Sequence, residues 1–179
     1  MPALPQSVYE QNKNIVDLPE PSLTKIFPTP AFYKESSGQF LLAGHFNIVV
    51  KKEDGLDAEK EYLETELNKL LKKSNGREAI QILLKKDASN SDVYRLQITP
   101  KTISIVSGTG RGIFYAIQSL KTLIPHQAYK AAQESITLPI VNVIDSARFP
   151  HRAFLLDVAR NFQTKEEVLK VLDLMSLYK

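Results

Sequence analysis

The sequence predicts an α+β protein, with an antiparallel or mixed sheet carrying two helices on one face, followed by one parallel strand–helix unit. Short strands of alternating polarity fall between residues 93 and 106, and two helical apolar stripes flank them. A nearly unbroken apolar run, Ala153–Val158, then precedes a capped amphipathic helix. Such runs are typical of strands buried on both faces of a parallel sheet.

Length and composition limit the classes of protein to consider. A chain of 179 residues with 43% hydrophobic and 24% charged residues suits one globular domain, or one domain and a fragment. Its 23 cations and 20 anions are mixed along the chain, which indicates a solvated surface and argues against nucleic-acid binding. The absence of cysteine excludes disulfides and thiolate metal sites. No apolar run approaches about 20 residues, so no membrane span is predicted.

The first third of the chain predicts a lead-in, strands and a helix. Residues 1–21 contain several prolines and few periodic apolar positions, which predicts a flexible lead-in. A short strand at Ala31–Tyr33 and a longer one at Phe40–Lys51 are expected next. Asp57 is a plausible N-cap for a helix to about Lys73, whose buried stripe is Leu63, Leu67, Leu70 and Leu71.

The middle of the chain predicts a sheet and a second helix. Strands are expected at Ala79–Leu84, Val93–Thr99 and Thr102–Val106, joined in antiparallel fashion by tight turns. A glycine-rich turn at 108–112 opens a helix that runs to about Ile124. Such a turn can cradle phosphate, but its spacing fits no nucleotide fingerprint, so close packing of the helix on the sheet is preferred. A last strand is expected at Ile136–Ile144.

The end of the chain predicts a capped helix directly behind the apolar run. Thr164 and Glu167 have the spacing of a capping box, and an apolar face follows them. The run itself holds one acid, Asp157, and a cation, Arg160, comes shortly after it.

Two blocks of this sequence resemble glycoside hydrolase family 20, the β-N-acetylhexosaminidases. Arg148-Phe149-Pro150-His151-Arg152 followed by Leu155-Leu156-Asp157-Val158-Ala159-Arg160-Asn161-Phe162 is similar to the entry into the family's catalytic barrel. Ala153, Ala159 and Asn161 depart from the family's usual Gly, Ser and His. The second block, Arg111–Leu120, is similar to the helix that closes the family's small N-terminal domain, with Ala116 in place of the usual Gly.

The resemblance implies a domain plan and a reaction. Residues 22–146 would form the N-terminal accessory domain, and 147–179 the first strand and helix of an incomplete (β/α)8 barrel. The family hydrolyses terminal β-linked GlcNAc or GalNAc with retention, through attack by the substrate's own acetamido oxygen. Its catalytic Asp-Glu pair lies later in the barrel, so no catalytic residue is assigned here and this chain is expected to be inactive alone.

The resemblance also assigns site residues. Arg160 matches the arginine that hydrogen-bonds hydroxyls of the terminal sugar, a role that suits the planar donors of a guanidinium. Asp157 would support that subsite or form a structural ion pair, with Arg152 or Arg160 as its partner. The three histidines are far apart in the sequence, so no metal is predicted, and no cofactor is expected.

An alternative is a non-catalytic module that binds glycans or partner proteins, or acts as a scaffold in front of a glycosidase barrel. The absence of Trp and the scattered tyrosines favour a supporting role over sugar binding. Ala153–Val158 without barrel neighbours is expected to dock on the sheet, pair with a second copy or be disordered. The resemblance further implies a periplasmic or secreted protein with a glycan substrate.

Overall fold

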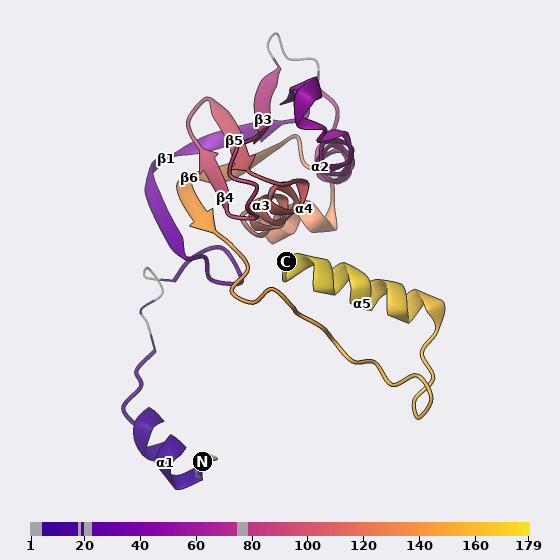
Figure 1. Ribbon diagram of the computed structural model, residues 1–179. Helices are drawn as coiled ribbons and strands as arrows, with labels where there is room; N and C mark the ends of the chain where they lie inside the picture. Colours follow the sequence, from indigo (N-terminus) through magenta and orange to yellow (C-terminus); the bar gives the residue numbers. More distant parts are fainter. Residues whose placement is uncertain (1–4, 18, 20–22, 75–78) are drawn as a thin grey trace.

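The computed structural model describes residues 5–17, 19, 23–74 and 79–179 and confirms the α+β class. Figure 1 shows a sheet and its helices at one side of the molecule, and a long arm that leads to the last helix. The helices are α1 (Pro5–Asn12), α2 (Asp57–Leu70), α3 (Gly110–Thr122), α4 (His126–Lys130) and α5 (Lys165–Leu177), with a 3-10 turn at Lys52–Asp54. The strands are β1 (Phe32–Ala43), β2 (Phe46–Val50), β3 (Ile80–Lys86), β4 (Tyr94–Ile98), β5 (Thr102–Ser107) and β6 (Ser135–Asp145).

The sheet has six strands in the order β1-β6-β4-β5-β3-β2 and is mixed. The β1–β6, β6–β4 and β4–β5 pairs are antiparallel. The β5–β3 and β3–β2 pairs are parallel, so the expectation of antiparallel joining was wrong for β3. The reason is that β3 pairs with β5 and not with β4, the next strand along the chain, so β3 and β5 run in the same direction. The parallel β2–β3 pair is joined by α2, which acts as a crossover helix.

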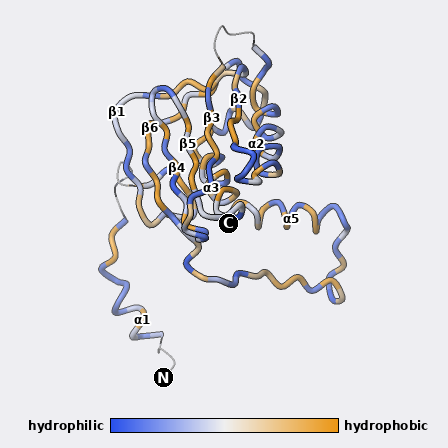
Figure 2. Tube along the Cα trace, turned by 45° about the horizontal axis from the view of Figure 1, so that its top comes forward, coloured by the Kyte–Doolittle hydropathy of each residue, from blue (hydrophilic) through white to orange (hydrophobic). Residues whose placement is uncertain are grey.

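The core lies between one face of this sheet and the helices α2 and α3, as predicted. Along β4, Tyr94, Leu96 and Ile98 are buried toward the helices, while Arg95 and Gln97 are exposed on the other face. Figure 2 shows hydrophobic residues along the strands of the sheet and on α3, and also on the arm and α5. Helix α3 buries eight of its residues, from Gly112 to Leu120, so it is the central helix of the core.

The strand predicted over Phe40–Lys51 is broken at Gly44 and His45. A Cβ atom on Gly44 would lie 1.8 Å from the carbonyl oxygen of Lys72, so the strand passes too close to the end of α2 for any side chain there. The ribbon of β1 and β6 also bends at a bulge between Ser36 and Gln39, where Gly38 has a φ of +102°. The consecutive strands β1 and β2 lie at opposite ends of the strand order.

Three smaller features differ from the sequence-based expectations. Leu56, and not Asp57, is the N-cap of α2, and Asp57 is the first helical residue, where its charge still suits the helix dipole. The short helices α1 and α4 were not expected. Helix α1 falls in the predicted flexible lead-in and buries none of its residues; the rest of that prediction concerns residues that partly lie outside the described ones.

The largest correction concerns the strand predicted at Ala153–Val158. Residues 151–157, all described, form no strand, and their side chains are exposed except that of Leu156, which is half-buried. A strand requires a neighbour to pair its backbone N–H and C=O groups, and no described strand lies beside this segment. The helix behind it does form, with the predicted capping box of Thr164 and Glu167. Pairing of Ala153–Val158 with a second copy stays a prediction.

Candidate functional site

Arg160 and Asp157 form the pair that the sequence suggested, on the exposed arm. The backbone N–H groups of Ala159 and Arg160 donate to Asp157 Oδ1 at 3.0 and 3.1 Å. Arg160 Nε lies 3.6 Å from Asp157 Oδ2, and the Arg160 side chain is 91% exposed. Asp157 therefore fixes the turn that carries Arg160, and the guanidinium donors stay open to solvent.

Arg152 lies elsewhere and does not contact Asp157. Its Nε donates to the backbone oxygen of Lys179 at 2.7 Å, and its Nη2 donates to Tyr115 Oη at 2.9 Å. Its Nη1 donates to the carbonyl of Phe149, and the guanidinium carbon lies 5.6 Å from the centroid of the Tyr115 ring. Arg152 thus ties the start of the arm to α3 and to the end of α5, and of the two arginines it is Arg160 that pairs with Asp157.

A buried polar cluster that sequence reasoning missed lies where the arm leaves the sheet. Lys179 Nζ is 3.0 Å from Asp145 Oδ2 and donates to Tyr94 Oη at 2.8 Å. Tyr94 Oη also lies 3.0 Å from Asp145 Oδ2 and 2.6 Å from Ser119 Oγ. We call Lys179, Asp145, Tyr94 and Ser119 the lysine latch. The available signal was an acid that ends an apolar strand and a tyrosine on the inward side of another.

Burial shifts the pKa values of two groups of the latch, Lys179 and Tyr94. The side chains of Lys179 and Asp145 are only 7% and 9% exposed. Desolvation lowers the pKa of Lys179, and the hydrogen bond to Asp145 opposes that shift. Burial likewise raises the pKa of Tyr94 well above its ordinary value, so its hydroxyl stays protonated and able to donate.

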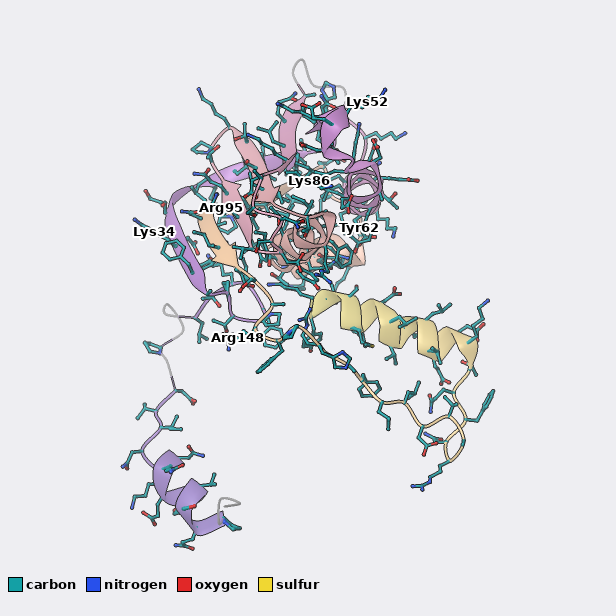
Figure 3. The ribbon with its side chains drawn as sticks, viewed as in Figure 1. Lys34, Lys52, Tyr62, Lys86, Arg95 and Arg148 are labelled. Carbon is teal, nitrogen blue, oxygen red and sulfur yellow. The ribbon has the colours of Figure 1, made fainter. Side chains whose placement is uncertain are left out.

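A cavity of about 850 Å³ lies between α5 and the helices α2 to α4. Its floor holds an ion pair, Lys121 Nζ to Glu66 Oε2 at 2.6 Å, and Lys121 also donates to Tyr62 Oη at 3.0 Å. Tyr62 lies on α2 beside α3 (Figure 3). Lys121, Glu66 and Tyr62 therefore satisfy one another on this side of the cavity.

The glycine-rich turn before α3 packs closely, as preferred, and faces acids. A Cβ atom on Gly112 would lie 1.9 Å from Ser107 Oγ, and one on Gly110 would lie 2.3 Å from Glu59 Oε1. Arg111 Nε donates to Asp92 Oδ2 at 2.7 Å. Carboxylates beside the first turn of α3 oppose phosphate binding there.

The described residues show neither a metal cluster nor a membrane-spanning helix. Over residues 5–17, 19, 23–74 and 79–179, no three side chains of His, Asp or Glu are grouped so that they could hold a metal ion. In the same part of the chain, no helix is long and apolar enough to cross a membrane.

Comparison with known families divides the chain at the point where the sheet ends. Residues 23–146 match the family model described as glycosyl hydrolase family 20, domain 2. Residues 149–179 match the model described as glycosyl hydrolase family 20, catalytic domain. A beta-hexosaminidase of Vibrio vulnificus is 32% identical over 174 residues, which cover 96% of this chain and 19% of that protein. The chain thus spans about a fifth of that relative's length.

Solved structures share the fold. A family 20 exo-β-N-acetylglucosaminidase from Vibrio harveyi, in complex with N-acetylglucosamine, superposes with a TM-score of 0.73 at 24% identity, over 86% of this chain and 24% of that one. A β-N-acetylhexosaminidase from Bacteroides fragilis superposes with a TM-score of 0.65 at 25% identity, over 85% and 31% of the two chains.

Proposed function

The chain belongs to glycoside hydrolase family 20, and from that membership we propose that it is the accessory domain and first catalytic-domain segment of an exo-β-N-acetylhexosaminidase. The observation that carries the proposal is the order of the two matches, with domain 2 directly followed by the start of the catalytic domain. The substrate is a glycan that ends in β-linked GlcNAc or GalNAc, and hydrolysis proceeds with retention through the substrate's acetamido group.

In this proposal, Arg160 binds hydroxyls of the terminal sugar. Its planar guanidinium donors suit adjacent hydroxyls, and the side chain, which pairs with Asp157 through Nε only, is 91% exposed and accessible to a sugar. Asp157 orients the turn through its bonds to two backbone N–H groups. The strand of Ala153–Val158 forms when the other barrel strands lie beside it, which places Arg160 at its carboxyl end, where barrel active sites gather.

The 179-residue chain has no hydrolase activity of its own in this proposal. By resemblance, the acid–base glutamate and its neighbouring aspartate come later in the barrel than residues 149–179. The accessory domain supports the barrel and does not bind glycans by itself, since no row of exposed aromatic rings crosses the described part of its sheet.

The test compares the 179-residue chain with the full reading frame that contains it, using aryl β-N-acetylglucosaminide and β-N-acetylgalactosaminide substrates. Turnover is expected from the longer protein only. In that protein, Arg160→Ala should lower kcat/KM by about 10- to 200-fold, the loss expected for a hydrogen bond from a charged donor. The matched control is Lys165→Ala, an exposed cation at the start of α5. A well-folded longer protein that turns over neither substrate would refute the proposal and favour a non-catalytic binding module.

A further inference from the structure

Helix α5 meets the accessory domain at one end only. None of its thirteen described residues is buried, and the large apolar side chains Leu169, Leu172, Leu174 and Met175 are all exposed. Figure 1 shows the helix extending away from the sheet, with its C-terminal end beside α3. Apolar burial along the helix therefore does not hold it in this position.

The contacts of α5 concentrate at its last turn. The Lys179 ammonium bonds to Asp145 and Tyr94, and the Lys179 backbone oxygen accepts from Arg152. Tyr178 packs edge-on against Phe27, with ring centroids 5.4 Å apart. The bonds made by Lys179 depend on one helix position and direction. The start of the arm is held separately, where Arg148 (Figure 3) donates to the carbonyl of Thr29 at 3.4 Å.

The latch is also fully partnered on the sheet side. Asp145 Oδ1 accepts from the backbone N–H of Ala31 at 3.2 Å, so the carboxylate bonds to the entry of β1 as well as to Tyr94 and Lys179. Ser119 on α3 bonds to the Tyr94 hydroxyl. The entry of β1, the strands β4 and β6, and the helix α3 thus all contribute to the pocket that holds the Lys179 ammonium group.

A buried ammonium fixes geometry more strictly than an apolar contact does. Apolar surfaces tolerate sliding and rotation, whereas a buried amine that leaves its carboxylate loses both charge partner and solvent. Removing one partner of such a pair is strongly destabilising, because it leaves a buried charge without a partner. A helix held mainly through this pair should occupy one orientation or be released.

We propose that the pocket of Asp145, Tyr94 and Ser119 is a lysine-specific docking site that sets the position of the first catalytic-domain helix on the accessory domain. Its occupant is Lys179 of the same chain. This inference deepens the proposed function, since it identifies the contact through which the accessory domain orients the barrel. Its test measures docking without turnover, so it can fail while the proposed activity holds, and the reverse.

The first experiment is amide hydrogen exchange on the 179-residue chain. Lys179→Met keeps an unbranched side chain but removes the charge, and it should speed exchange within α5 by about 100-fold or more, because undocking then requires no ion pair to break. Exchange in β4 and β6 should not change. The control is Lys170→Met, an exposed lysine of the same helix. Equal protection of α5 in wild type and Lys179→Met, or no protection in either, would overturn the proposal.

The second experiment measures orientation directly. The chain lacks cysteine, so spin labels can be attached at cysteines introduced for the exposed residues Gln97 on β4 and Glu166 on α5. The labelled chain should give one narrow distance distribution, which broadens in Lys179→Met and in Asp145→Asn. Asp145→Asn retains an oxygen for Ala31, so it separates loss of charge from loss of the β1 contact. A distribution that stays narrow in both variants would contradict the docking role.

Discussion

The accessory domain and the arm carry the same kind of sequence signal and have different structures. In the accessory domain, apolar strands beside amphipathic helices become a sheet whose inward side chains, such as Leu96 and Ile105, are fully buried. In the arm, the apolar run Ala153–Val158 and the capped helix α5 leave their apolar side chains exposed. An apolar run in the sequence therefore does not form a strand by itself. It forms one only where neighbouring strands pair with its backbone.

Large-to-small substitution should separate the two regions most strongly. Leu96→Ala in the sheet should lower the free energy of unfolding by about 2–5 kcal/mol, because it leaves a cavity in a packed core. Leu155→Ala, at a side chain that is 89% exposed, should change it by less than about 0.5 kcal/mol. Urea titration of each variant measures both, and similar losses would show that the arm is packed in solution.

Small-to-large substitution should give the next largest difference. Gly112→Ala places a Cβ atom against Ser107 Oγ and should cost about 1–3 kcal/mol through strain. Ala153→Val in the arm adds more atoms but meets solvent, so a change below about 0.5 kcal/mol is expected. Thermal unfolding of the two variants gives the comparison. An unchanged Gly112→Ala variant would mean that α3 packs less closely on the sheet than described.

Loss of an ion pair should also lower the free energy of unfolding more in the accessory domain than in the arm. Burial raises the pKa of Glu66, but hydrogen bonds from Lys121 and Lys69 outweigh it and hold that pKa below its ordinary value of about 4.5. Glu66→Gln should therefore cost about 1.5–3 kcal/mol near neutral pH. Asp157→Asn, which removes an exposed pair, should cost no more than about 1 kcal/mol of stability.

The sign of the pH effect follows from the lowered pKa of Glu66. The folded state binds a proton at Glu66 less readily than the unfolded state, so the contribution of Glu66 is complete above the ordinary pKa and declines as pH falls below it. The difference between wild type and Glu66→Gln should therefore shrink on acidification. Urea titrations between pH 7 and about pH 3 measure it, and a difference independent of pH would exclude this role for the pair.

The capping box should have the smallest effect on overall stability. Thr164→Ala removes the hydroxyl that accepts from the backbone N–H of Glu167 and should destabilise α5 by about 0.5–2 kcal/mol. The accessory domain shares few contacts with α5, so its unfolding midpoint should not move. Circular dichroism and thermal unfolding together separate the two effects. A lower midpoint would show that α5 stabilises the sheet.

Local patterns in the sequence predicted most of the fold. Alternating polarity identified β4 and β5, helical periodicity identified the buried stripe of α2, and the spacing of two residues identified the capping box of α5. Each of these patterns depends on residues close together in the chain. The break at Gly44 depends on the close approach of Lys72, and the parallel pairs of β3 depend on which strands become its neighbours. Periodicity does not encode either of these long-range contacts.

The sequence predicted the local part of the candidate site and missed the contacts between residues far apart in the chain. The pairing of Asp157 with Arg160 spans three residues and could be anticipated from the sequence. The lysine latch joins Tyr94, Ser119, Asp145 and Lys179, which lie far apart in the chain, and nothing in the sequence sets their distances. Arg152 likewise donates to Tyr115 on α3, a contact between residues too far apart in the chain for a local motif to predict.

The most direct measurement is amide hydrogen exchange of Ala153–Val158 in two proteins, the 179-residue chain and the full reading frame with its catalytic domain. The account predicts fast exchange in the short chain, since these backbone groups have no strand partner, and protection by about 100-fold or more in the longer protein, where neighbouring strands pair with them. Fast exchange in both proteins, or protection already in the 179-residue chain, would contradict the claim that this segment is a barrel strand awaiting its neighbours.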